Sequence, residues 1–227
     1  MFATTQWSLV LAAREGEHAA AALAELCRRY REPVIAYLRR SGQSGADAED
    51  LAQGFFVRLL EKRFDLSADP TRGRFRSFLL GALRHHLGDD QDARQAQRRG
   101  GGVAHDDIAD RAHSLMDAGR TPEQAFDHAY ALVTIERALA RLRDEARAAG
   151  YGDRHAALAP LLLEAREPGA LEQVARILDV RANTLAVMLG RWRERLAQLV
   201  RAELAETLAD PAQVDDEMRA LRAVLRS

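Results

Sequence analysis

Residues 171–199 have the pattern of a helix-turn-helix, a motif whose chemistry is contact with nucleic-acid bases and phosphates. A short helical segment ends near Leu178, the residues Asp179, Val180 and Arg181 form the turn, and a longer helical segment follows. The turn residue after the first helix often needs a left-handed backbone, which Asp adopts less readily than Gly. Apolar residues recur where two helices would pack at a steep angle: Val174, Leu178, Val180, Leu185 and Met188. The pattern predicts recognition of the DNA major groove, and the alternative is a plain helical hairpin in a bundle.

Two local clusters of arginine supply positive charge, although the 227-residue chain has a formal net charge of −1. Residues 70–101 hold seven arginines and three aspartates, and residues 176–201 hold six arginines and two acidic residues. Between them, residues 101–125 hold five acidic residues and two arginines. Because the whole chain is nearly neutral, indiscriminate binding of nucleic acid is not expected. Any contact with DNA must come from the two basic clusters.

No residue pattern predicts catalysis or a bound metal. The seven histidines do not pair at a spacing of four with an acidic third ligand, and residues 89–92 lack the glycine and terminal glutamate of a calcium loop. The sequence has neither a Walker-type phosphate loop nor a nucleophile elbow. The single cysteine, Cys27, has no second cysteine to pair with. We therefore expect no enzymatic activity, no cofactor and no metal site.

The elements that position these residues are expected to be helices throughout. Ala, Leu, Arg and Glu dominate, and no convincing alternation with a period of two is present, so the fold class is all-α. Residues 44–47 and 121–124 have the spacing of N-terminal caps. In helix 48–62, Leu51, Phe55 and Leu59 form a stripe that predicts a buried face. The expected helices are 5–13, 18–30, 33–40, 48–62, 74–92, 122–149, 155–165, the two of the helix-turn-helix, and a tail helix with Val214, Met218, Leu221 and Leu225 on one face.

Three consecutive glycines, residues 100–102, mark the best candidate for a flexible linker. The predicted organisation is a first module over 1–99, a Gly/Asp-rich linker over 100–121, a second module over 122–209 and a C-terminal helix over 210–227. No apolar run approaches the roughly 20 residues of a membrane span. The first residues lack the order of a signal peptide. A cytoplasmic location and no membrane partner are therefore expected.

Several motifs occur in a telling order and spacing: Thr4–Val10, Asp47–Gln53, Phe55–Phe56 with Leu59–Glu61, Arg72–Leu80, Gln97–Val103 and Ala209–Asp215. Through them most of the chain resembles the extracytoplasmic-function (ECF) sigma factors of the sigma-70 family. The resemblance implies a region 2-like helical bundle and a region 4-like helix-turn-helix, joined by the flexible linker. It also implies that the chain binds core RNA polymerase and directs promoter-specific transcription initiation, while the polymerase performs the chemistry.

The resemblance assigns core-polymerase binding to the helix that opens near Asp47. The residues implied are Asp47, Glu49, Asp50, Leu51, Gln53 and Phe56. Carboxylates are favoured at a helix start and can pair with arginines across an interface, while neighbouring apolar residues supply buried area. The alternative is that these acids only cap a surface helix.

By the same resemblance, the helix from Arg74 melts the promoter and recognises the minus-ten element. Single-stranded bases stack on aromatic, His or Arg side chains while basic groups follow the phosphates. The implied residues are Arg76, Arg84, His85, His86 and Arg94. The alternative is a solvated arginine face, with Phe75, Phe78 and His86 in the core.

The helix-turn-helix is implied to read the minus-thirty-five element. Its second helix begins with residues that lie closest to base edges, where Asn183 would bond adenine bidentately and Thr184 would meet a thymine methyl. Arg181 and Arg191 would bind phosphate or guanine. The full implied set is Arg181, Asn183, Thr184, Arg191 and Arg195.

The chain departs from the family pattern at Gly54, Gln91, Ala186 and Gly190, so promoter specificity is unusual or DNA binding is weakened. Two other functions stay open: a divergent sigma-like adaptor that binds protein but reads DNA poorly, and a stand-alone helix-turn-helix regulator. The resemblance also suggests an anti-sigma factor as a partner, and the tail helix is a candidate control element. A Ser/Thr kinase is a further candidate partner, because arginines 72, 74 and 76 would surround a phosphate on Thr71.

Overall fold

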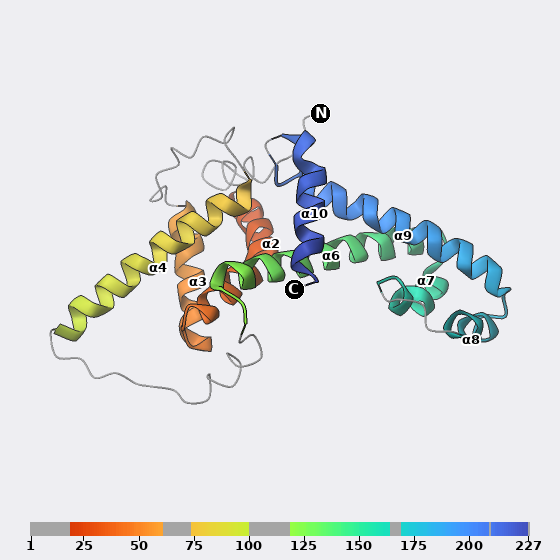
Figure 1. The fold of residues 1–227 in the computed structure, drawn as a ribbon, viewed down its shortest axis with the longest axis horizontal. Helices are drawn as coiled ribbons and strands as arrows, with labels where there is room; N and C mark the ends of the chain where they lie inside the picture. Colours follow the sequence, from red (N-terminus) through yellow and green to blue (C-terminus); the bar gives the residue numbers. More distant parts are fainter. Residues whose placement is uncertain (1–18, 61–73, 100–118, 164–168, 209, 227) are drawn as a thin grey trace. The chain divides into compact units, whose positions relative to one another are not determined.

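All regular secondary structure in the described parts of the chain is helical (Figure 1). The computed structural model describes residues 19–60, 74–99, 119–163, 169–208 and 210–226, and no strand occurs among them. The all-α prediction is therefore confirmed. The elements are α2 (Ala19–Arg40), α3 (Gly45–Leu60), α4 (Phe75–Arg99), α6 (Pro122–Ala148), α7 (Gly152–Leu158), η3 (Ala159–Leu161), α8 (Ala170–Ile177), α9 (Ala182–Ala205), η4 (Pro211–Gln213) and α10 (Val214–Val224).

Some predicted features lie outside the described residues, among them the helix over residues 5–13, the glycine segment at 100–102 and the phosphorylation candidate Thr71. Within the described residues, no helix is both long enough and apolar enough to cross a membrane.

The helices divide into two compact units. The first comprises Met1–Val133 with Leu204–Ser227, and the second comprises Thr134–Glu203. The division falls within α6 and close to the end of α9. The module boundaries expected from the sequence, at residues 99, 122 and 210, concern functional modules and stay predictions.

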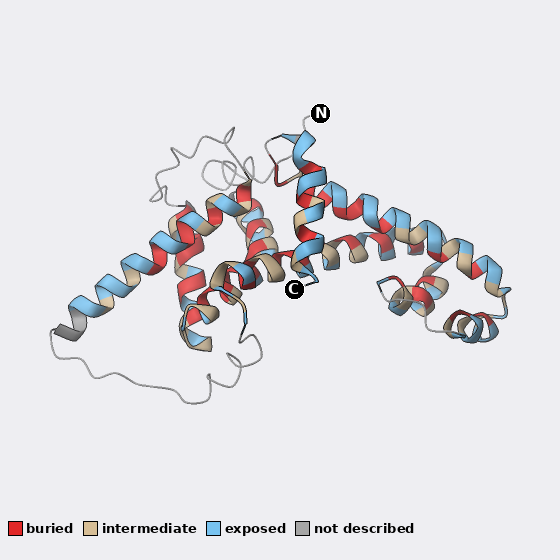
Figure 2. Ribbon diagram, in the orientation of Figure 1, coloured by how far each residue is buried: buried red, intermediate tan, exposed pale blue. Residues whose placement is uncertain are grey.

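The core of the first unit is built from buried faces of α2, α3 and α4 (Figure 2). Leu51, Phe55 and Leu59, the stripe predicted for α3, are all buried. The prediction of two helices over 18–30 and 33–40 is wrong, because α2 is one helix that contains Pro33. Pro33 has no N–H to donate, so it removes one hydrogen bond of the helix. Burial of apolar side chains on both sides of Pro33 offsets that loss; these side chains are Leu26, Tyr30, Val34, Ile35 and Leu38.

Both predicted N-terminal caps are present. At α3, the hydroxyl of Ser44 accepts a hydrogen bond from the backbone N–H of Asp47 (3.1 Å) and donates one to its carboxylate (3.0 Å). At α6, the hydroxyl of Thr121 accepts from the backbone N–H of Gln124 (3.2 Å), while the amide oxygen of Gln124 accepts from the N–H of Thr121 (2.8 Å). These bonds satisfy backbone donors that a helix start leaves unpaired.

The second unit packs the later part of α6 with α7, α8 and α9 around leucines such as Leu142, Leu158 and Leu185. The prediction of one helix over 155–165 is wrong. The α-helix ends at Leu158, and a 3₁₀ turn follows over Ala159–Leu161. Pro160 lies in that turn and lacks the N–H that would continue the α-helical ladder.

The tail helix α10 buries a different stripe from the predicted one. Val214 and Leu221 are buried as expected, whereas Leu225 is exposed because it follows the last residue of α10. Met218 is half-buried. A carboxylate residue, Glu217, takes a place in the buried stripe with only 2% of its surface exposed.

Candidate functional site

One face of α3 is exposed and carries a carboxylate, an amide and an apolar side chain. Asp50 and Gln53 are exposed, and Val57, at 47% exposure, lies on the same side of the helix because these residues are spaced by three and four. We refer to Asp50, Gln53 and Val57 as the α3 face. Sequence reasoning missed Val57, although its position seven residues after Asp50 was a usable signal.

The other predicted core-binding residues of α3 are paired or buried. Asp47 contributes to the cap and lies 3.4 Å from a guanidinium nitrogen of Arg94. Glu49 forms an ion pair with Arg31 of α2. Leu51 and Phe56 are buried in the first unit, so they support the helix instead of presenting surface. Of the predicted core-binding residues, Asp50 and Gln53 are thus exposed, and Asp47 and Glu49 are partly accessible.

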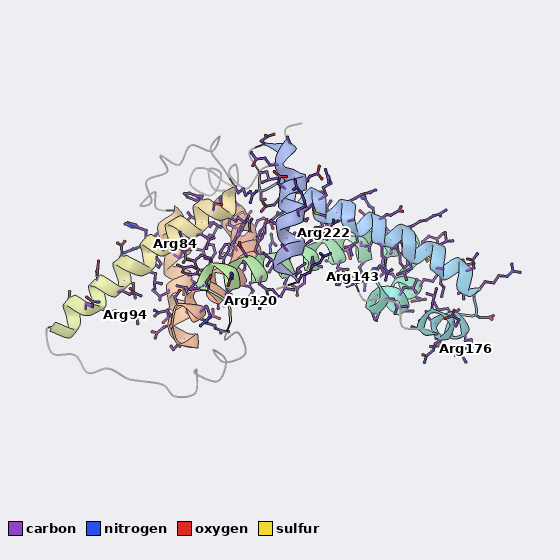
Figure 3. All side chains as sticks on the ribbon, in the orientation of Figure 1. Arg84, Arg94, Arg120, Arg143, Arg176 and Arg222 are labelled. Carbon is purple, nitrogen blue, oxygen red and sulfur yellow. The ribbon has the colours of Figure 1, made fainter. Side chains whose placement is uncertain are left out.

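The predicted minus-ten residues do not form one patch on α4. Figure 3 labels Arg84 and Arg94 at separate places along the helix. Arg84 binds one carboxylate oxygen of Glu123 through two nitrogens, at 2.9 and 3.1 Å, and this hydrogen bonding raises the pKa of Arg84 above its ordinary value. Arg94 pairs with Asp90 at 2.7 Å. Arg84 and Arg94 are therefore both already held by a carboxylate of the same unit.

Arg76 differs from Arg84 and Arg94 because its side chain is only 13% exposed. A guanidinium nitrogen, Nη1, lies 2.6 Å from Asp127 of α6. Its Nε lies 2.7 Å from Oε1 of Glu217 in α10 without a hydrogen bond of its own, while its Nη2 donates a hydrogen bond to Oε2 of Glu217 at 3.4 Å. Arg76 is thus enclosed by carboxylates from two other helices.

The adjacent histidines of α4 point in different directions, as the sequence predicted. His85 is exposed, whereas His86 is buried against Phe55, with ring centroids 5.8 Å apart. Nε2 of His86 lies 3.1 Å from the carbonyl oxygen of Leu51, which can only accept, so Nε2 carries the proton. Nδ1 then accepts from Arg58, at 3.3 Å. His86 therefore joins α4 to α3 and is not available for stacking on a base.

The environment of His86 makes the stability of the first unit depend on pH. Burial lowers the pKa of His86, the charge of Arg58 lowers it further, and the bond to the Leu51 carbonyl partly opposes this. Below the ordinary value of 6.5, the unfolded chain takes up a proton that the folded chain does not. We expect the urea midpoint to be highest above that pH and to decrease as the pH falls from about 7.5 to about 5.5.

A control variant separates the contribution of His86 to this pH dependence from the contributions of other titrating groups. His86→Gln keeps a donor for the Leu51 carbonyl and does not titrate, so its midpoint should decrease less over the same pH range. The pKa of His155 is also lowered, chiefly by burial, and it accounts for a remaining decrease in the same direction. A wild-type midpoint that stays constant or rises on acidification would contradict this role of His86.

The second unit contains two helices, α8 and α9, joined by a tight turn at the place of the predicted helix-turn-helix. The turn residue Asp179 has a φ of +51°, the left-handed conformation that the sequence indicated. The N–H of Val180 donates to the carbonyl of Ala175 at 3.0 Å, as in a Schellman-type helix end. The carbonyl of Arg181 then accepts from the N–H groups of Thr184 and Leu185, at 2.9 and 3.3 Å, which starts α9. The turn and both helices lie where the sequence placed them.

The start of α9 presents most of its predicted DNA-contacting residues to solvent. Arg181, Asn183, Thr184 and Arg191 are exposed, while Leu185 faces the core. The missed neighbour is Val187, which is 49% exposed and lies between Thr184 and Arg191 on one face at spacings of three and four. We call Asn183, Thr184, Val187 and Arg191 the α9 face.

Two residues of α9 modify the sequence-based picture. Arg195 is bound by both carboxylate oxygens of Glu145 at 2.8 Å, so it connects α9 to α6. Gly190 is exposed, with no neighbouring atom within 4 Å of the position that a Cβ would occupy, and α9 continues through it. Its lack of a side chain therefore leaves the α9 face open and does not break the helix.

Within the described ranges, no three His, Cys, Asp or Glu side chains are grouped so that they could hold a metal ion. Comparison with curated proteins and with solved structures found no match. Residues 26–99, which include α3, α4 and most of α2, match the family model described as sigma-70 region 2. Over these residues the chain is thus similar to sigma-70 region 2.

Proposed function

We propose that this chain is a sigma factor of the ECF type, which binds core RNA polymerase and directs promoter-specific transcription initiation. The observation that carries the proposal is the region 2 match over residues 26–99, which supports a role in polymerase binding and promoter melting. The chain then performs no catalysis itself, because the polymerase makes the phosphodiester bonds. Its location would be cytoplasmic.

The α3 face is the proposed contact with core polymerase. Asp50 offers an exposed carboxylate in the second turn of α3, where it can pair with an arginine of the partner. Val57 offers apolar surface that an interface would remove from water. An acidic residue beside exposed apolar area suits a partner surface with basic and apolar side chains.

Promoter contacts are proposed for two separate surfaces. In the first unit, Arg84, His85 and Arg94 are accessible on α4 and would meet the minus-ten strand. In the second unit, the α9 face would enter the major groove at the minus-thirty-five element, with Arg181 at its start. Val187 suits contact with a thymine methyl, beside the hydrogen-bonding groups of Asn183 and Thr184.

The test is a titration of the full chain against bacterial core RNA polymerase. We expect binding below micromolar concentration, weakened at least about tenfold by Asp50→Arg, because a desolvated charge pair would be reversed. Asp144→Arg is the matched control, since Asp144 is an exposed carboxylate on α6, remote in sequence from the α3 face. Equal weakening by both variants, or no binding by the folded wild type, would contradict the proposal.

A stand-alone helix-turn-helix regulator is the second candidate function. It is favoured by the complete turn at Asp179 and the exposed α9 face, which lie outside residues 26–99. Such a regulator would bind duplex DNA tightly without polymerase, whereas the proposed sigma factor requires the holoenzyme. A divergent adaptor would instead bind polymerase and give no footprint on a selected promoter. Regulation by an anti-sigma factor or a Ser/Thr kinase belongs to the sigma-factor proposal.

A further inference from the structure

The C-terminal helix α10 places a buried carboxylate against the arginines that begin α4. Glu217 Oε2 lies 3.0 Å from Nε of Arg74, and Oε1 lies 2.7 Å from Nε of Arg76. Both arginines and the glutamate belong to the first unit. We propose that α10 is a built-in inhibitor of nucleic-acid binding, in which Glu217 occupies a phosphate site formed by Arg74 and Arg76. This inference rests on the proposed promoter contacts of α4.

Two guanidinium groups around one anion are a suitable receptor for a nucleic-acid phosphate. Arginine forms charge-assisted contacts with carboxylate and phosphate through the same planar set of donors. The two arginines occupy the first turn of the helix and the residue before it, within the segment that matches region 2. A carboxylate that fills this receptor keeps both positive charges from a DNA strand.

Glu217 is an exception to the packing of its own helix. The residues that α10 buries, Val214, Glu217 and Leu221, recur at spacings of three and four. An apolar side chain at the middle position would pack without the cost of taking a carboxylate out of water. Packing of α10 therefore does not explain a carboxylate at this position, whereas its ion pairs with Arg74 and Arg76 do.

The attachment of α10 is small enough to be displaced. The helix has 11 residues, fewer than the roughly 12–15 that make an isolated helix marginally stable, and it buries only two apolar side chains. The preceding segment is held separately, since Phe75 N–H donates to the carbonyl of Thr207 at 3.2 Å and Arg29 pairs with Glu206 at 2.8 Å. Release of α10 would therefore leave that segment bound to the unit.

Replacement of the Glu217 carboxylate by a DNA phosphate is favoured over release of the carboxylate with no anion in its place. Removing one partner of a buried ion pair is costly because the remaining charge is uncompensated, whereas a phosphate would compensate it again. The pairing with Glu217 also leaves Nε–H of Arg76 without a hydrogen bond. A DNA strand held elsewhere on the protein would thus compete with α10 for the arginines.

The test compares two variants of the full chain that each remove one carboxylate of α10. Glu217→Gln removes the buried carboxylate, and Asp216→Asn removes an exposed neighbour that contacts only Arg219 among the described ion pairs. Binding of a fluorescent single-stranded DNA oligonucleotide is measured by anisotropy over a range of salt. We expect Glu217→Gln to tighten binding at least about fivefold and to steepen the salt dependence, because Arg74 loses this carboxylate partner and Arg76 keeps only Asp127 within the described part of the chain. Asp216→Asn should stay close to wild type.

Equal DNA binding by the two variants would overturn the inhibitory role. Loss of the proposed function would be seen separately, as failure of both variants and wild type to bind core polymerase. Because Glu217→Gln could disturb folding, amide hydrogen exchange of α10 in the wild type gives a second measurement. Saturating oligonucleotide should speed exchange in residues 214–224, and unchanged or slower exchange there would also overturn the role.

Discussion

Replacing Phe55 by alanine is expected to lower the free energy of unfolding of the chain by about 3–5 kcal/mol. Phe55 is fully buried in α3, where its ring contacts Phe56 and His86 at centroid distances of 5.4 and 5.8 Å. The truncation removes apolar contact area and leaves a cavity that the surrounding helices close only in part. Urea denaturation followed by circular dichroism measures the loss.

Val57→Ala is the control for Phe55→Ala. It lies two residues along the same helix, but its side chain is about half exposed, so the expected change is within about 0.5 kcal/mol. The pair also separates folding from binding, because Val57→Ala should weaken binding to core polymerase while leaving stability almost unchanged. A small loss for Phe55→Ala would show that this part of the unit is loosely packed.

The positions of α3 and its core stripe were predictable because they depend on local spacing. Leu51, Phe55 and Leu59 recur every four residues, and Ser44 sits where a cap is needed. Phe56 was assigned to an exposed contact by resemblance, yet it is buried. Aromatic residues at adjacent positions point in different directions on a helix, so only the packing of the whole unit decides whether both are covered.

The ion pairs that Arg76 and Arg84 form with other helices were not predictable because their partners lie far away in sequence. Arg84 pairs with Glu123, and Arg76 pairs with Asp127 and Glu217, at separations of 39, 51 and 141 residues. Local charge counts treat these arginines as free positive charge. The structure assigns each of them a carboxylate, which depends on how three helices pack and not on any pattern within α4.

The turn between α8 and α9, in contrast, is almost fully specified by neighbouring residues. It falls at Asp179, and the backbone there is left-handed although the residue is not glycine. The extra energy of that conformation in Asp is modest, because its short polar side chain tolerates the left-handed region better than most residues. The helix α2 shows the opposite case, because burial of apolar side chains along it outweighs the local helix-breaking effect of Pro33.

Replacing Leu185 by alanine is expected to destabilise the chain by about 2–5 kcal/mol and to abolish the proposed recognition of duplex DNA by the second unit. Leu185 is fully buried near the start of α9, shortly after the left-handed residue that ends α8. Without this side chain, α9 loses an apolar contact with the core of the second unit. Denaturation measures the first effect, and footprinting with reconstituted holoenzyme on a selected promoter measures the second.

Asn183→Ala, two residues earlier, should separate recognition from folding. Asn183 is exposed, so the free energy of unfolding of the Asn183→Ala variant should stay within about 0.5 kcal/mol of the wild-type value. If it contacts a base edge, discrimination at one base pair should fall by about 1–3 kcal/mol while binding to the other positions is retained. Uniform weakening across all promoter variants would instead place Asn183 on the phosphates, because phosphate contacts position the protein without reading sequence.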